Sequence, residues 1–147
     1  MSPLRSIVYV SCAARPMNQS DLDRLLANAQ YRNARDDITG CLLYCDGNFI
    51  QLIEGPAEPL RRVCASICAD TRHAGIYQIV DEPIDSREFS GWAMGYASAD
   101  LQDFTTLHRS LLNGVDAAQA PARPFDGRRL LHDFWVQHGR GSNPLLA

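Results

Sequence analysis

The sequence predicts an α+β domain with the ferredoxin-like order β-α-β-β-α-β and one added fifth strand. Two β-prone runs flank Cys45-Asp46-Gly47-Asn48, and Asp-Gly is a strong hairpin signal because a type I′ turn needs positive φ at its centre. A segment with helical spacing of apolar residues lies on each side of this hairpin, and further β-prone runs begin and end the pattern. We expect both helices on one face of the sheet and C-terminal helices on the other.

The first strand is predicted over Leu4 to Ser11. Side chains alternate between the two faces of a strand, so Ile7 and Tyr9 share one face and Val8 and Val10 the other. Because both faces are apolar, this strand should be central and covered on both sides.

The first helix is expected to begin at Ser20, which fits a capping box with Asp23. It should end near residues 33–36. Its core side is marked by apolar residues three or four positions apart, at Leu22, Leu25, Leu26 and Ala29.

The hairpin strands are predicted over Ile38 to Tyr44 and Phe49 to Ile53, and Gln51 is the polar exception within them. An amide left without partners among apolar neighbours would cost about 1–3 kcal/mol. A polar group must therefore form hydrogen bonds with the side chain of Gln51. From the strand alone, a neighbouring side chain or a solvated face would serve.

A second helix is predicted with Pro59 in its first turn and core positions at Leu60, Val63, Cys64, Ile67 and Cys68. The two cysteines could in principle serve a metal, but they lie on the apolar stripe, so we assign them to the core and predict no metal site. A fourth strand is expected over Ile76 to Glu82. A fifth is expected over Trp92 to Tyr96, with Trp92, Met94 and Tyr96 on one face.

We divide the chain into a domain over residues 1–98 and a helical extension over residues 99–147. The extension contains two short amphipathic segments, one with Leu107, Leu111 and Leu112 and one with Leu130, Leu131, Phe134 and Trp135. They can cover the sheet face that carries Val8 and Val10.

The 147 residues have a net charge of −3 with acids and bases interspersed, which argues against binding to nucleic acid or to an anionic membrane surface. No apolar run approaches the roughly 18 residues of a membrane span, and no signal peptide is evident. The five cysteines include no C-x-x-C pair, as expected in a reducing compartment. A cytoplasmic location follows as an expectation.

An ordered set of short motifs carries a family resemblance. It comprises Ile7-Val8-Tyr9-Val10-Ser11, Asn33 followed by Ile38-Thr39-Gly40, Asn48 to Gly55, Asp70-x-Arg72-His73, and Arg87-x-Phe89-x-x-Trp92-x-Met94. Over about residues 4–96 this set resembles the BLUF family, blue-light photoreceptor domains that bind flavin. Each motif alone is weak, whereas the ordered set is specific.

The resemblance implies a flavin ring between the two helices, with FAD the expected cofactor and FMN or riboflavin the alternatives. Tyr9 would lie beside Gln51, and Gln51 would bond the N5 and O4 region of the ring. The other expected cofactor-binding residues are Arg32, Asn33 and Ile38 near the ring, Asp70, Arg72 and His73 towards the ribityl and phosphate end, and Met94. Trp92 and Met94 match the pair linked to signalling, so the expected photoactive residues are Tyr9, Gln51, Trp92 and Met94.

By this resemblance the chain is a blue-light photoreceptor rather than an enzyme. Excitation would move an electron and a proton from Tyr9 to flavin, and the hydrogen bonds around Gln51 would rearrange. The signal would pass to a separate effector protein, and a homo-oligomer is expected. Ala29 stands where many family members have serine, which should perturb the network without abolishing it. The alternatives are a small flavin-dependent oxidoreductase and a ferredoxin-like interaction module without cofactor.

Overall fold

The computed structural model describes residues 3–97, 101–117, 131–134 and 136. Its elements follow the predicted order. They are β1 (Leu4–Ala13), α1 (Gln19–Arg35), β2 (Thr39–Cys45), β3 (Asn48–Pro56), α2 (Ala57–Ala69), β4 (His73–Ile84), β5 (Gly95–Ala97) and α3 (Leu101–Ala117).

The five strands form one sheet in the order β4-β1-β3-β2-β5. Strands β4, β1, β3 and β2 pair antiparallel with one another, and β5 runs parallel to β2 at the edge. This is the ferredoxin-like arrangement with an added strand, so the predicted fold class is confirmed. The central position expected for β1 is confirmed as well, since it lies between β4 and β3.

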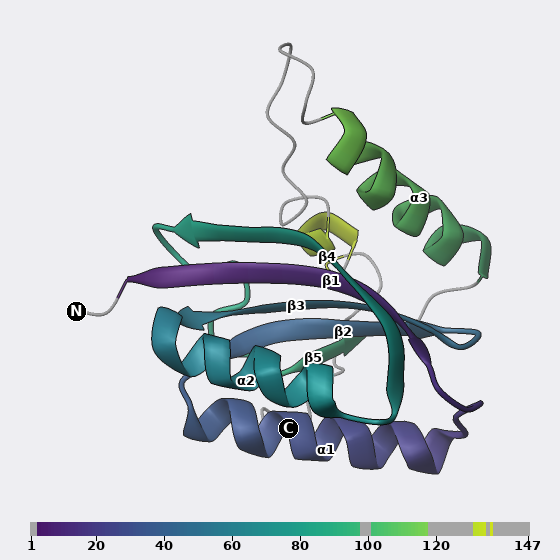
Figure 1. Ribbon diagram of the computed structural model, residues 1–147, viewed down its shortest axis with the longest axis horizontal. Coiled ribbons are helices and arrows are strands. Elements are labelled where there is room, and N and C mark those ends of the chain that lie inside the picture. The colour runs from purple at the N-terminus through teal and green to yellow at the C-terminus, as the bar shows by residue number, and fades with distance from the viewer. Residues whose placement is uncertain (1–2, 98–100, 118–130, 135, 137–147) are drawn as a thin grey trace.

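The core is divided into two clusters by the sheet. Helices α1 and α2 lie side by side on one face, and α3 lies on the other (Figure 1). On the helix-pair face, Ile7, Tyr9 and Ile53 pack with Leu22, Leu25 and Ala29 of α1 and Leu60, Val63 and Ile67 of α2. On the opposite face, Val8, Val10, Ile50 and Leu52 pack with Phe104, Leu107 and Leu111 of α3 and with Leu131. The expected cover by C-terminal helices is therefore confirmed; Leu130 and Trp135 lie outside the described residues.

The β2–β3 hairpin has the predicted turn. Asp46 and Gly47 have φ angles of 47° and 84°, so both central residues occupy the left-handed region that a type I′ turn requires.

The predicted cap of α1 was wrong. The helix begins at Gln19, and its N-cap is Asn18, whose side chain accepts a hydrogen bond from the Asp21 N–H at 2.8 Å. The Asp21 carboxylate accepts in return from the Asn18 N–H at 3.1 Å, which completes a capping box. Ser20, two positions later, is already inside the helix.

The predicted placement of the fifth strand was also wrong. It runs over Gly95–Ala97, and Trp92 packs against the cluster on the α3 side while Met94 belongs to the helix-pair side. The chain turns before β5: the Trp92 N–H donates to the Phe89 carbonyl at 3.0 Å, and Gly91 has a φ of 85°. Because alternation of faces holds only in an extended chain, it did not apply to Trp92.

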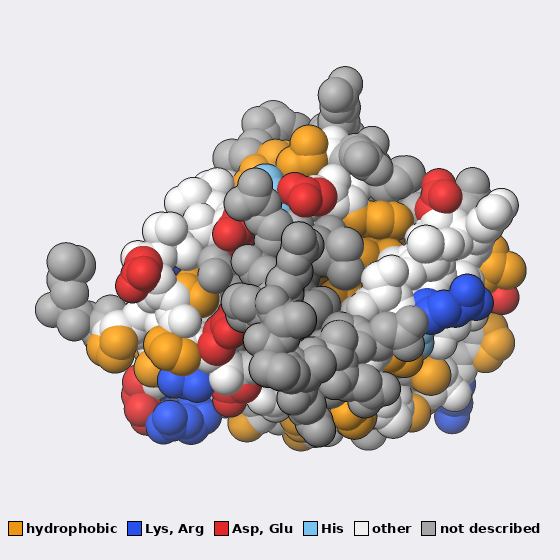
Figure 2. Space-filling view, turned by 90° about the horizontal axis from the view of Figure 1, so that it is seen from above, with side chains coloured by type: hydrophobic (Ala, Val, Ile, Leu, Met, Phe, Trp, Pro, Cys, Tyr) orange, Lys and Arg blue, Asp and Glu red, His pale blue; other side chains and the backbone are white. Residues whose placement is uncertain are grey.

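Acidic and basic side chains are both scattered over the face seen from the α3 side, with hydrophobic side chains between them (Figure 2). No helix within the described ranges is long and apolar enough to cross a membrane.

Candidate functional site

Tyr9 and Gln51 occupy directly opposite positions in the β1–β3 ladder. The Tyr9 hydroxyl donates a hydrogen bond to Oε1 of Gln51. Tyr9 is 1% exposed and Gln51 4%, so this bond lies inside the core. The polar partner that the sequence demanded for Gln51 is therefore present.

Burial raises the pKa of the Tyr9 phenol well above its usual value, and the positive charge of Arg32 opposes this only partly. The phenol is therefore neutral and able to donate at physiological pH. Its bond to Oε1 directs the other end of the amide, Nε2, away from Tyr9.

The Nε2 group of Gln51 faces the sulfur of Met94, with 3.9 Å between Nε2 and Sδ. Met94 is fully buried on the helix-pair side. A thioether is a weak hydrogen-bond acceptor. The amide donor is thus directed at a partner that a stronger acceptor on a ligand could replace.

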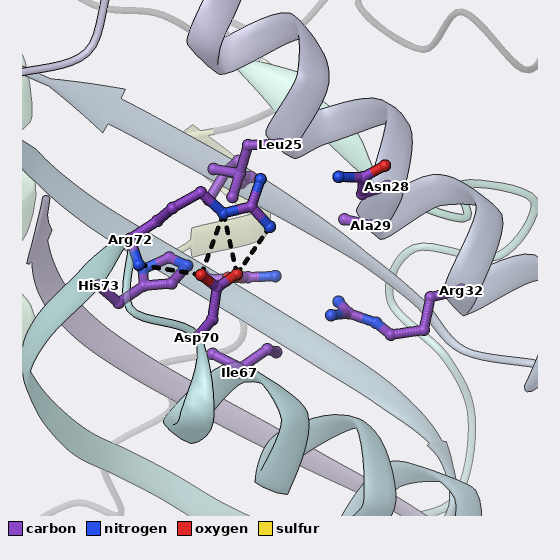
Figure 3. A pocket seen from close by; sticks show the side chains of 10 residues that line it. Leu25, Asn28, Ala29, Arg32, Ile67, Asp70, Arg72 and His73 are labelled. Atoms are coloured by element: carbon purple, nitrogen blue, oxygen red, sulfur yellow. Dashed lines mark hydrogen bonds and ion pairs between the residues drawn. The ribbon is translucent and has the colours of Figure 1, made fainter.

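A hollow lies between α1 and α2, with Gln51 and Leu42 of the sheet at its base. It has about 320 Å³ of space between the atoms, counted with the open solvent at its mouth. Its residues mix apolar walls with polar groups (Figure 3): Leu25, Asn28, Ala29 and Arg32 of α1, Ile67 of α2, and Asp70, Arg72 and His73.

The charged end of the hollow is formed by Asp70 and Arg72. Arg72 folds back over Asp70 (Figure 3), with its Nη2 2.7 Å and its Nε 3.0 Å from the carboxylate. These bonds hold the pKa of Asp70 below its usual range. Because Asp70 is the partner of Arg72, an anionic ligand group would compete with this carboxylate for the guanidinium.

His73 lies beside this pair. Its Nδ1 is 3.2 Å from Oγ of Ser11, and its ring centroid is 4.8 Å from that of Phe49. Burial lowers the pKa of His73, so the imidazole is held in the neutral form.

Arg32 extends from α1 into the gap between the helices (Figure 3). Burial lowers its pKa, and its Nε lies 3.4 Å from Oδ1 of Asn33. Asn33 itself is fully buried outside the hollow, where its Nδ2 donates to the Ala93 carbonyl at 2.8 Å.

Ile38 also lies outside the hollow. It is buried in the core beside Gly55, where an added Cβ would come within 2.6 Å of Cδ1 of Ile38.

The structure therefore brings together five of the predicted cofactor-binding residues as lining of one hollow: Arg32, Gln51, Asp70, Arg72 and His73. Tyr9 and Met94 lie behind Gln51 and contact it. Asn33 and Ile38 do not line the hollow, and Trp92 packs towards the α3 side of the sheet.

Two buried polar residues escaped sequence reasoning. Gln30 is 3% exposed and donates to the Met94 carbonyl. Glu54 is fully buried, and its carboxylate accepts from the N–H groups of Glu88 and Phe89 at 2.9 and 2.7 Å. For Gln30 the signal was available: it stands eight positions after Leu22, on the core stripe of the helix.

The donors of the hollow suit a planar aromatic ligand with a polar, anionic tail. Apolar walls from Leu25 and Ile67 can pack against a ring, and the Gln51 amide can bond a ring heteroatom. Arg72 can pair with phosphate. These residues fit a flavin.

Comparison with known proteins decides the family. Residues 4–95 match the family model described as "BLUF: Sensors of blue-light using FAD". The chain belongs to the BLUF family.

Among curated relatives of this BLUF domain is the "Photoactivated adenylate cyclase subunit beta" of Euglena longa, 35% identical over 101 residues. That match covers 68% of this chain and 12% of the relative. The "Blue light- and temperature-regulated antirepressor BluF" of Escherichia coli (strain K12) is 30% identical over 106 residues, which cover 72% of this chain and 25% of that protein. The matched region thus spans only a small part of the length of these relatives.

Solved BLUF structures agree over most of the chain. The dark-state structure of BlrB, described as a BLUF protein, has a TM-score of 0.70 and 28% identity and covers 93% of this chain and 98% of its own. The photo-activated state of BlsA has a TM-score of 0.67 and 25% identity and covers 91% of this chain and 93% of its own.

Proposed function

We propose that this BLUF domain senses blue light through a hydrogen-bond switch at Gln51 and passes the change to a separate effector protein. One observation supports the proposal above all: Tyr9, Gln51 and Met94 form a continuous buried chain of contacts behind the hollow. A polar amide between a phenol and a thioether, at the base of a hollow between two helices, is an arrangement that core packing alone does not require.

In this proposal Leu25 and Ile67 would pack against the flavin ring, and Gln51 would bond it at the base of the hollow. Arg32 would hold the imide side of the ring, and Asn33 and Ile38, which do not line the hollow, would support this side from the core. Asp70, Arg72 and His73 would hold the ribityl and phosphate end. Flavin, when bound, supplies absorption of blue light and an excited state that accepts an electron.

The residues of the chain then carry out the switch. Tyr9 would give an electron and its hydroxyl proton to the bound flavin, and both would return to Tyr9 when the dark state is restored. Gln51 exchanges the donor and acceptor ends of its amide by rotation or tautomerisation, which reverses its bonds without moving charge. Met94 senses the exchange because its sulfur faces Nε2 in this structure. Trp92, packed on the other side of the sheet, would respond through the backbone that it shares with Met94.

A second groove supports FAD over FMN or riboflavin. It shares Asn28 and Arg72 with the hollow, is also lined by Arg15 and Arg24, and encloses about 1200 Å³ with its open mouth. Three guanidinium groups beside the phosphate end suit a diphosphate, because arginine pairs with phosphate through two parallel hydrogen bonds. The adenosine half of FAD would extend into this groove.

The route by which the signal leaves the sensor is also part of this proposal. The matched relatives carry cyclase or antirepressor functions in their names, and their lengths far exceed this chain. For this chain we propose a sensor over residues 1–98, a helical extension over residues 99–147 that relays the change, a homo-oligomer, and a cytoplasmic location.

The deciding experiment is an absorption spectrum of purified protein reconstituted with FAD, recorded in the dark, under blue light and during recovery. A flavin band that moves to longer wavelength under light and returns in the dark supports the proposal. A protein that binds no flavin, or whose band does not move, contradicts it. Continuous reduction of the flavin by an added substrate would instead indicate an oxidoreductase.

A further inference from the structure

Two amide side chains of α1 hold the segment that carries Met94. Nε2 of Gln30 donates to the Met94 carbonyl at 3.0 Å, and Nδ2 of Asn33 donates to the Ala93 carbonyl at 2.8 Å. Gln30 is 3% exposed and Asn33 is fully buried, so both bonds are protected from water.

The residues on either side of this segment are held by β2 instead. The Trp92 carbonyl accepts from the Gly40 N–H at 3.0 Å, and Gly95 opens the parallel ladder opposite Cys41. Between these two anchor points, the carbonyls of Ala93 and Met94 are bonded to α1. The segment around Met94 is therefore held by hydrogen bonds to β2 at its two ends and to α1 in between.

The same helix forms one wall of the hollow. Leu25, Ala29 and Arg32 line the hollow, and Gln30 follows Ala29 directly in the chain. A displacement of α1 at this wall would reach the Met94 backbone through the Gln30 amide.

We propose that Gln30 is a positioning residue that holds Met94 by its carbonyl, keeps Sδ against the Gln51 amide, and so couples α1 to β5. Gln30 does not line the hollow and acts through Met94. This inference rests on the proposed light response, but its first test does not require flavin.

The first test is methyl NMR of protein labelled with ¹³C-methyl methionine. The chain has three methionines, and the Met94 signal is identified by its loss in Met94→Ala. In Gln30→Leu, which keeps a side chain of similar size but no donor, the Met94 signal should shift or divide into two, with and without flavin. In the control Gln19→Leu, which changes an exposed glutamine of the same helix, it should stay in place. An unmoved Met94 signal in Gln30→Leu would overturn the proposal.

The second test is a double-mutant cycle on the rate of dark recovery. Gln30→Leu should change the rate about threefold or more in the wild-type background and leave it nearly unchanged in the Met94→Ala background, since residues that act through each other are not additive. Equal changes in both backgrounds would contradict the proposal.

Gln30→Glu provides a second test of the hydrogen bond between Gln30 and the Met94 carbonyl if Gln30→Leu does not fold. A buried carboxyl has a raised pKa and can donate only when protonated. The Met94 signal of Gln30→Glu should therefore resemble wild type at low pH and move as the carboxyl ionises. A pH-independent Met94 signal would count against Gln30 as the donor. A wild type without light response would contradict the proposed function, whereas the NMR result judges the role of Gln30 by itself.

Discussion

The Tyr9 hydroxyl and Oε1 of Gln51 are joined by a hydrogen bond across two adjacent central strands. Their strand positions are direct partners, so the distance between the two side chains is set by the ladder rather than by a loop. This rigid pair is the starting point for the predictions below.

Gln51→Leu should retain the fold and bind FAD but lose the light-induced shift of the flavin band, because leucine cannot bond the phenol or the ring. Absorption spectra before and after blue light measure this. Gln78→Leu is the matched control: Gln78 is the partner of Tyr9 on its other side, in β4, and is exposed. A normal shift in Gln51→Leu would remove Gln51 from the mechanism.

Tyr9→Phe should bind FAD yet lose the photoreaction, because only the phenolic hydroxyl is missing. Flavin fluorescence should rise, since the electron donor that shortens the excited state is absent. Tyr44→Phe, which removes a hydroxyl from a partly buried tyrosine of the same cluster, should behave as wild type. If Tyr9→Phe responds normally, another residue is the donor.

Met94→Ala should leave most of the spectral shift but uncouple it from α3. Methionine is unbranched and adaptable, so it can repack when its neighbour changes. Hydrogen exchange over residues 107–112 and 131–134, in the dark and under light, measures the coupling. Met17→Ala is the control, because Met17 packs at the margin of the same cluster. Equal light-induced exchange in wild type and Met94→Ala would show that the signal leaves elsewhere, such as through residues 70–75.

Arg72→Ala should weaken FAD binding about tenfold, as expected for loss of a charge-assisted hydrogen bond, and riboflavin binding much less. Removal of Arg72 also leaves Asp70 without its partner, but that effect is common to all flavins. The ratio of dissociation constants for FAD and riboflavin, from fluorescence titration, is therefore the measurement. Arg61→Ala, at an exposed arginine of α2, is the control. An unchanged ratio in Arg72→Ala would argue against a phosphate contact.

His73 should make the flavin-free fold less stable in mild acid. Burial lowers its pKa from about 6.5, so below that pH the unfolded chain binds a proton more readily than the folded one. The contribution of neutral His73 to the free energy of unfolding is complete above about pH 6.5, and it is lost as the pH falls towards the pKa of His73 in the folded chain. Urea denaturation between pH 7 and 5 should show a shallower decline in His73→Gln. The pKa of His108 is also lowered by burial, but it contributes equally to both proteins.

The sequence was most informative where a local rule applied. The Asp-Gly turn located the hairpin, and alternation along extended strands placed Tyr9 and Gln51 on the helix-pair face. The same alternation misplaced Trp92, because residues 93 and 94 form a bend and the extended chain of β5 begins only at Gly95.

The hydrogen bond of Gln30 could not be predicted from local sequence patterns. Its partner is a backbone carbonyl 64 positions later, and nothing in the surrounding sequence specifies that partner. Glu54 is a similar case, since the N–H groups that satisfy its carboxylate belong to residues 88 and 89. Sequence could show that such residues lie on a buried face but not what they bind.

The short length of β5 has a consequence for a sensor kept in darkness. Only three residues join it to the sheet, at the edge, whereas Tyr9 and Gln51 lie on strands paired on both sides. Edges with few pairs open with the smallest free energy, so thermal opening of β5 should occur without a photon. Each such opening would release the segment beside Met94 and would produce, without light, the change that illumination produces. We expect the background output in the dark to follow the opening free energy of β5, which amide exchange of Gly95 and Tyr96 can measure. A variant in which β5 opens less often should then have a lower output in the dark and should also need more light for activation.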